Sequence, residues 1–508
     1  MLWEIAKKEL HSNIIAARFI VGFIICLMLI SASTYVAIRD YKRRLNDYNV
    51  AVKEHREEVL NAKVYSEIRP KADRQPNPLS IFSQGMDKRL ANTFTIYTSV
   101  VPALYDGEKH GAYNPFLTLF PSIDLTFIFQ IVLSLLALLS AYDAISGERE
   151  GDTLKLMLSN PVSRSVILLG KYMSALISLF WPMAVSIIFA LLMIMFSNSI
   201  SLTGSEFLRI LLIVFVSLLY VSLFYLIGLL ISIKTRRTAT SLMLCMFVWV
   251  SLTLVYPNAG GLLADRFIKS KTGAEEFSQI NELWSNFKKD RDKYKEKVWP
   301  ERGFGGSSGS RSGSQPDTLF YFYYEFRSVT GDPSREADIN SMRNYYRHVE
   351  PMRIRTADSA WQIRKQALDE SHGRKQRLAR QILRLSPAAI YSNAAATSAG
   401  TDLGAIQQFM EQVRDYRRSL IRYFYGQKAF SSAEWFMYPK DKGEGEAEPG
   451  GGIILRRPDF SSVPAFHQRT ESIASNMNRG MTDMLLLIIA NGMFFIISYS
   501  LFMRQETK

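Results

Sequence analysis

Residues 146–171 read SGEREGDTLKLMLSNPVSRSVILLGK and lie between two long apolar runs of the chain. Charged residues are concentrated at the start of this stretch, and the apolar segment that follows ends at Asn160 and Pro161. Thr153 suits the start of a helix, and Pro161 cannot continue one because its ring removes a backbone donor. The stretch therefore predicts a short helix over 152–159 at a membrane surface. An ordinary polar loop with a chance helical turn is the alternative interpretation.

The composition is that of an integral membrane protein with polar parts. The chain has 508 residues, of which 48% are hydrophobic, a formal net charge of +14 and a mean hydropathy near zero. That average combines several apolar runs with several strongly charged regions, and about 18 or more apolar residues are enough to cross a bilayer as a helix. The Lys and Arg residues are scattered among acids without a recognition module, so nucleic-acid binding is not expected.

Six apolar runs predict a polytopic helical membrane protein. Residues 1–13 are expected to form an amphipathic helix in the membrane interface, because a basic face lies opposite an apolar face that borders on a Trp. Two charged segments, 39–124 and 257–482, separate the runs. The expected spans are 14–38, 125–145, 172–196, 207–233, 239–256 and 483–503.

The short loops predict the orientation. The loop 234–238 contains Lys234, Arg236 and Arg237 without any acid, whereas the connection 197–206 has no Lys or Arg. Because an excess of Lys and Arg marks cytoplasmic loops, we expect 146–171, 234–238 and both termini to be cytoplasmic. The expected location is a bacterial inner membrane.

The two long segments are then expected to form a mainly helical extracytoplasmic domain with a few strands. The first span should continue as a helix beyond residue 39, since the chain up to 68 lacks Gly and Pro. Further helices are expected at 274–298, in two halves of 334–385 separated by Pro351, and at 403–425. The expected strands are 95–101 and 320–329.

No catalytic constellation, cofactor site or metal site is evident in the sequence. The Gly170-Lys171 pair lacks the upstream glycine of a P-loop. A match to the Gly-x-Ser-x-Gly pattern of a nucleophilic serine occurs at 305–309, but it lies in a Gly/Ser tract, so we interpret it as accidental. If ATP drives this protein, another chain must bind it. Asp124, Asp143 and Asp483 lie at membrane edges, which argues against an ion-coupled carrier. Hydroxyl groups at 217–225 suggest a polar path or, as we favour, hydrogen bonds between helices.

Several motifs, in order along the chain, resemble the ABC-2 type transporter permeases. They are DAISGEREGDTL (143–154), LSNPVSR (158–164), LGK (169–171), 77–87, 232–240 with Trp249 and Pro257, 385–387 and 399–402. The resemblance is to the branch with a large loop, akin to the permeases of gliding motility and of copper-enzyme maturation. One departure is an extra residue, Asp152, between Gly151 and Thr153.

This resemblance implies that 146–171 holds the coupling helix, which seats in a cleft of a separate ATPase subunit. The implied ATPase-coupling residues are Glu148, Arg149, Glu150, Gly151, Thr153, Leu154, Met157, Leu158, Pro161 and Arg164, with Lys234, Arg236 and Arg237 in the second loop. The implied partners are a dimer of ATPase subunits that binds ATP and Mg²⁺, a second identical or homologous permease, and an envelope or periplasmic partner. The expected function is a non-catalytic permease subunit of an exporter. The alternative is an ATPase-driven protein that transmits force or assembles the envelope and moves no solute; a membrane enzyme ranks third.

Overall fold

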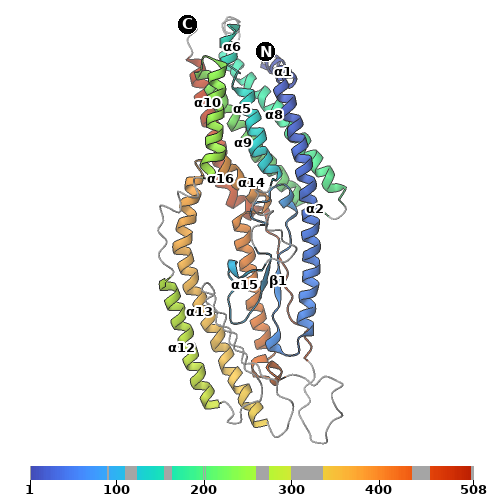
Figure 1. Ribbon diagram of the computed structural model, residues 1–508, viewed down its shortest axis with the longest axis vertical. Helices are drawn as coiled ribbons and strands as arrows, with labels where there is room; N and C mark the ends of the chain where they lie inside the picture. Colours follow the sequence, from blue (N-terminus) through green and yellow to red (C-terminus); the bar gives the residue numbers. More distant parts are fainter. Residues whose placement is uncertain are drawn as a thin grey trace.

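The computed structural model describes residues 2–88, 91–108, 123–153, 163–197, 200, 202–258, 274–298, 336–437 and 458–504. Figure 1 shows an elongated, mainly helical molecule, with a bundle of helices at the end that holds both termini and a second group of helices at the other end. We call these two parts the membrane domain and the distal domain.

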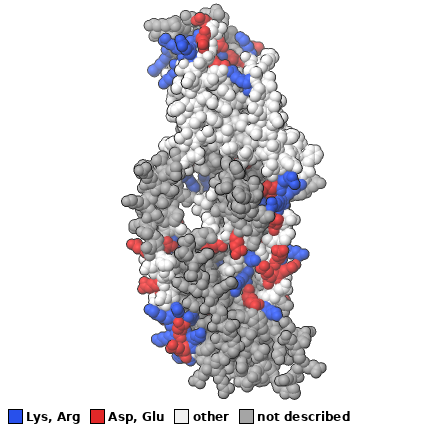
Figure 2. Space-filling model, in the orientation of Figure 1, with Lys and Arg blue, Asp and Glu red and all other residues white. Residues whose placement is uncertain are grey.

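The membrane domain contains six helices that are long and apolar enough to cross a membrane, which confirms the predicted fold class for the described residues. Figure 2 shows a surface without charged side chains over these helices, between charged groups near the termini and charged groups on the distal domain. A separate helix, α1 (Leu2–Ile15), precedes them. The six are α2 (Ala17–Asn61), α4–η4–α5 (Leu125–Ile128, Phe129–Leu133, Ser134–Ala141), α8 (Arg164–Met195), α9 (Gly204–Lys234), α10–η5 (Thr238–Val250, Ser251–Val255) and α16 (Ile473–Met503).

Helix α9 lies at the centre of the membrane domain. Its most apolar stretch is 67% buried, compared with 22% for α2, α10 and α16. A helix that is apolar all round suits burial on all sides, while the outer helices bury one stripe only. In α2 that stripe includes Phe19, Cys26 and Ile30, and the neighbouring Ile24 and Met28 are exposed.

Hydroxyl groups of α9 bond to neighbouring helices. The Tyr220 hydroxyl donates to the Gln130 carbonyl at 3.1 Å, inside the π-helical turn η4. Ser222 donates to Asn491 of α16 at 2.7 Å, and the Tyr225 hydroxyl donates to the Lys171 carbonyl of α8 at 3.3 Å. This agrees with the favoured interpretation of 217–225 as interhelical bonding.

An unexpected helix, α14 (Pro387–Ala399), is buried in the membrane domain. Ser386 caps its start, and the Ser386 hydroxyl donates to the Leu252 carbonyl at 2.7 Å. Helix α14 packs against both α9 and α16. Tyr391 stacks on Tyr220 with ring centroids 4.4 Å apart, and its hydroxyl lies 2.9 Å from Ser217. The many alanines of α14 allow this close approach. The sequence predicts no helix for these residues, which fall within the segment 257–482 that is expected to be wholly extracytoplasmic, and their burial among the spans corrects that expectation.

The distal domain is built from both long segments. Its core joins Val59 and Phe94 of the first segment to Trp284, Tyr345 and Phe424 of the second. Helix α2 continues into it for a total of 45 residues, so the predicted extension beyond residue 39 is present up to Asn61. The main elements are α12 (Ala274–Val298), α13 (Glu336–Leu383), α15 (Leu403–Gly426) and the antiparallel pair β1 (Lys71–Asp73) and β2 (Thr93–Thr95), in which Ala72 faces Phe94. The short helices are η1 (Tyr65–Glu67), η2 (Pro78–Ile81), η3 (Leu104–Asp106), η7 (Ala429–Ser431) and η8 (Ala433–Trp435).

Two expectations for this domain are corrected. Helix α13 runs through Pro351 without a break, because Tyr346, Val349 and Ile354 around it are all buried in the same core. The strand expected at 95–101 ends at Thr95, since the guanidinium of Arg417 takes the backbone carbonyls of 97 and 98 that a partner strand would use. The strand expected at 320–329 lies outside the described residues.

Candidate functional site

The quoted stretch begins with a short helix, α6 (Ser146–Glu150), at the end of the membrane domain that holds the termini. Its first backbone amides are held by Ser232 near the end of α9. The Ser232 hydroxyl accepts from the amides of Ile145 and Ser146 at 3.0 and 2.9 Å. The Ser146 hydroxyl donates to the Tyr142 carbonyl at 2.7 Å. Helix α6 is therefore fixed to the bundle at its start.

Two charged side chains of α6 bind the ends of two neighbouring helices. Arg149 donates to the carbonyls of Thr235 and Ile233, at the C-terminal end of α9, at 2.7 and 3.2 Å. Glu150 accepts from the amide and the hydroxyl of Thr238, at the N-terminal end of α10, at 2.9 and 2.7 Å. A helix favours a positive charge at its C-terminal end and a negative charge at its N-terminal end, so both contacts are electrostatically favourable. We call the contacts of Ser232, Arg149 and Glu150 the α6 clamp.

Lys171 is a buried cation that joins α6 to the first helix of the chain. Its side chain is 4% exposed, and its ammonium lies 2.8 Å from a carboxylate oxygen of Glu9 and 3.5 Å from one of Glu148. The preceding Gly170 allows this contact, because a Cβ there would lie 3.0 Å from Ile5 of α1. The Gly170-Lys171 pair therefore seats α1 against α8.

The extra residue of the motif lies where α6 ends. Asp152 has a φ of 54°, in the left-handed region that Asp tolerates better than most residues. The Gly151 amide donates to the Gly147 carbonyl at 2.9 Å, and the Thr153 hydroxyl donates to the Glu148 carbonyl at 3.2 Å. Asp152 thus forms the turn that closes α6.

Two further arginines tie the ends of the spans together. Arg164, predicted to brace the loop, is the first residue of α8 and donates to the Met503 carbonyl at the end of α16 at 3.0 Å. Arg18 of α2 forms two hydrogen bonds, at 2.6 and 3.1 Å, with the carboxylate of Asp143 at the end of the second span. Helix α8 begins at Arg164, so Lys171 lies on a helix and not in a loop.

The remaining predicted residues divide into two sets. Lys234, Arg236 and Arg237 are exposed beside α6, as are Gly151 and Thr153. Leu154, Met157, Leu158 and Pro161 lie outside the described residues, and so does most of the helix predicted at 152–159. The assignment of all these residues to an ATPase contact stays a prediction.

The geometry suits mechanical linkage. Among the described residues, no group of three or more His, Cys, Asp or Glu side chains could hold a metal ion. The sequence predicts Glu148, Arg149 and Glu150 as contacts to a partner, which stays a prediction, and does not reveal their contacts within the chain. It also missed Ser232 and Glu9, because each lies far along the sequence from its bonding partner.

Comparisons with known proteins indicate the family of the chain. A family model described as "ABC-2 family transporter protein" matches residues 3–433. Two curated proteins match a short part of the chain, and both are called "Probable ABC transporter permease protein NosY". The one from Pseudomonas aeruginosa is 51% identical over 49 residues, which are 10% of this chain and 18% of that protein. The one from Stutzerimonas stutzeri is 58% identical over 41 residues, which are 8% of this chain and 15% of that protein. The chain thus spans less than a fifth of the length of either relative. The family match over most of the chain, together with the six spans, shows that this is a multi-pass membrane protein of the ABC-2 transporter family.

Proposed function

We propose that the chain is the permease subunit of an ATP-driven ABC-2 transporter, and that a separate ATPase docks on α6, residues 151–162 and the exposed cations of the loop 234–238. The ATPase would bind ATP and Mg²⁺, and this chain would transmit the movement. Both termini would face the cytoplasm of a bacterial inner-membrane protein, and the distal domain would lie outside the cytoplasm. Two permeases, identical or homologous, would assemble with two ATPase subunits, and export is the direction that the family resemblance implies.

The α6 clamp is the observation that carries this proposal. Arg149 and Glu150 connect α6 to two different helix ends, so a push on α6 must move the end of α9 and the start of α10 together. Helix α9 is the most buried span of the bundle. Its displacement would therefore repack the other spans, because a closely packed interior transmits small shifts.

A second connection leads from the same surface to the distal domain. Glu148 contacts Lys171, Lys171 contacts Glu9 of α1, and Arg18 at the start of α2 binds Asp143. Helix α2 is then continuous for 45 residues, about 68 Å. Movement at the ATPase would reach the distal domain through this helix.

Affinity purification of the tagged chain in mild detergent tests this proposal. We expect a P-loop ATPase to co-purify and hydrolyse ATP, and Leu154→Asp to abolish both the association and the activity. A charged side chain in the predicted apolar contact would have to lose its hydration against the partner. Recovery of the ATPase with Leu154→Asp at the wild-type level would refute docking at this loop.

A second candidate function is force transmission without solute movement, in which the ATPase drives the distal domain to act on an envelope partner. The continuous helix α2, anchored in both cores, favours it. ATP-dependent accumulation of a substrate in inverted vesicles would favour transport. ATP-dependent distance changes in the distal domain without any substrate movement would favour force transmission.

A further inference from the structure

A polar cavity lies in the distal domain, between α13 and α15 and beside the segment that follows β2. Its volume is about 320 Å³, at the lower end of the range of small-molecule sites. It is lined by Val101, Asp358, Trp361, Gln362, Lys365, Glu411, Arg414, Arg417 and Arg418. None of these residues belongs to the proposed ATPase-docking surface.

The lining carries more positive than negative groups, and its two carboxylates are already paired. Asp358 bonds Arg417 at 2.7 Å, and Glu411 bonds Arg414 at 2.8 Å. Among the described residues, Lys365 forms no ion pair, and it is exposed at the cavity. Arg418 pairs with Asp415, which is not part of the lining. Each of the three arginines thus has a carboxylate partner, and among the described residues Lys365 is the cation of the wall whose charge is not balanced.

Arg417 places a poorly hydrated positive charge at the cavity. Its side chain is 3% exposed, whereas that of its partner Asp358 is 53% exposed. Burial lowers the pKa of the Arg417 guanidinium, and the Asp358 carboxylate only partly opposes this. Because the Asp358 carboxylate already balances this charge, Arg417 shapes the wall, and Lys365 supplies the attraction for an anion.

A stacked pair fixes the geometry of the wall. The Arg414 guanidinium lies 4.3 Å from the centre of the Trp361 ring, and its Nε donates to the Pro102 carbonyl at 3.2 Å. Arg417 likewise donates to the Tyr97 carbonyl at 3.2 Å. The two arginines are thus held in place before any ligand binds, which lowers the entropy cost of binding.

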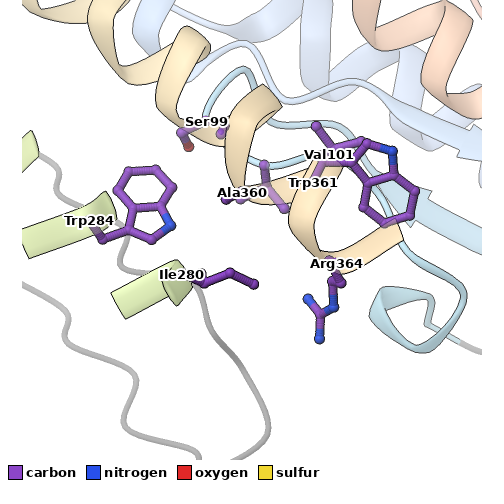
Figure 3. A pocket seen from close by; sticks show the side chains of 9 residues that line it. Ser99, Val101, Ile280, Trp284, Ala360, Trp361 and Arg364 are labelled. Atoms are coloured by element: carbon purple, nitrogen blue, oxygen red, sulfur yellow. The ribbon is translucent and has the colours of Figure 1, made fainter. Parts of the chain in front are cut away.

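A neighbouring apolar pocket is too small to be the site. Figure 3 shows Trp361 and Val101, which also line the polar cavity, across from Trp284 and Ile280 of α12. Its volume of about 10 Å³ corresponds to a single water molecule. The Trp284 ring nitrogen is buried and has no partner among the described residues, which suits such a water. Any larger ligand would use the polar cavity.

We propose that the polar cavity binds a small soluble anion with carboxylate or phosphate groups. A bilayer lipid does not fit, because Trp361 lies 22 residues before the end of α13, about 33 Å along the helix. That end adjoins α14 in the membrane domain. Binding at this cavity does not require the ATPase, so a negative result here would leave the proposed function unaffected.

Calorimetric titration of the full chain in detergent, at low salt, tests the site with citrate and tripolyphosphate as probes. We expect saturable binding of at least one probe. Binding of citrate alone identifies a carboxylate ligand, binding of tripolyphosphate alone identifies a phosphate ligand, and binding of both identifies recognition by charge. Trp361 fluorescence should change on binding, and Trp361→Phe should remove that change.

Charge reversal locates the binding to the cavity. Lys365→Glu should weaken binding about tenfold or more, because an attraction at contact distance becomes a repulsion. Arg422→Glu makes the same change at an exposed position of α15 outside the lining. It should leave the affinity nearly unchanged. Lys365→Gln, which removes the charge without reversing it, gives a second variant and should weaken binding less. Absence of saturable binding in the wild type, or equal weakening by Lys365→Glu and Arg422→Glu, would overturn the proposal.

Discussion

At the scale of single residues, Arg149 contributes through contacts within the chain. Its guanidinium bonds two carbonyls at the end of α9. Arg149→Met keeps much of the side-chain length and removes both bonds, at a cost of about 1 kcal/mol for a half-buried group. We expect the melting temperature of the detergent-solubilised protein to fall by about 2 °C.

Arg236→Met is the matched control, because Arg236 is exposed in the adjacent loop. It removes the same charge without breaking a bond to α9, and because it also relieves the repulsion between Arg236 and Arg149, it should not lower the melting temperature. Equal effects of the two substitutions would mean that Arg149 acts through net charge and not through the α6 clamp.

Among the residues around α6, replacement of Lys171 should lower the stability of the protein most. Lys171→Met leaves the carboxylates of Glu9 and Glu148 close together without a cation, and breaking such a buried pair costs about 3 kcal/mol. The double variant Lys171→Met/Glu9→Gln should recover part of this loss. Thermal unfolding of both variants measures the stability that is lost and recovered. No recovery in the double variant would show that Lys171 does not act through Glu9.

The sequence identifies the charged residues of this region but not their partners. Glu148, Arg149 and Glu150 stand out because they begin a polar stretch between two apolar runs. Arg149 and Glu150 bond to residues more than 80 positions away, and no local pattern encodes such pairs. The left-handed turn at Asp152 was equally hidden, since the sequence shows only an extra residue.

At the scale of elements, the packing of α1 on α8 depends on Gly170. A Cβ there would already lie 3.0 Å from the Ile5 side chain, a tight contact, so the two further methyl groups of Gly170→Val should push α1 away from the bundle. Trypsin should then cleave after Lys7 or Lys8 about fivefold faster, as expected for a loss of about 1 kcal/mol in local stability. Mass spectrometry of the fragments gives the rate.

Gly492→Val is the control for this prediction, because a side chain at Gly492 meets nothing within 4 Å. It should not alter cleavage in α1, and Ile5→Ala should relieve the effect of Gly170→Val. Unchanged cleavage in Gly170→Val would show that α1 does not depend on this close contact.

The sequence predicts elements well where the pattern is long and fails where packing decides. Apolar length locates the six spans, and the helices expected at 274–298 and 403–425 are present as α12 and α15. Helix α14 is short and rich in alanine, so its burial follows only from its neighbours α9 and α16. Pro351 does not break α13, since the core around it compensates for the missing backbone bond.

At the scale of the whole molecule, helix α2 connects the two domains. Asn49 and Val50 are exposed in the part of α2 that extends beyond the apolar span. Replacing both with Gly should soften the helix without disturbing either core, because each Gly disfavours helix by about 1 kcal/mol relative to Ala. We expect the ATPase to remain bound while ATP-dependent movement of the distal domain, measured by spin-label distances, is lost.

The same two positions replaced with Ala provide the control. Ala keeps the helix stiff, so movement of the distal domain should persist. If the Gly and Ala variants behave alike, α2 does not carry the movement.

Site-directed photo-cross-linking at the α6 surface tests the central claim most directly. A cross-linker is attached to Thr153→Cys, next to the α6 clamp, and in a parallel sample to Gly426→Cys in the distal domain; both positions are exposed, and the native Cys26 and Cys245 are buried. Our account predicts that a P-loop ATPase is cross-linked at Thr153→Cys and not at Gly426→Cys. Cross-linking of the ATPase at Gly426→Cys alone, or at neither position in a complex that still hydrolyses ATP, would contradict it.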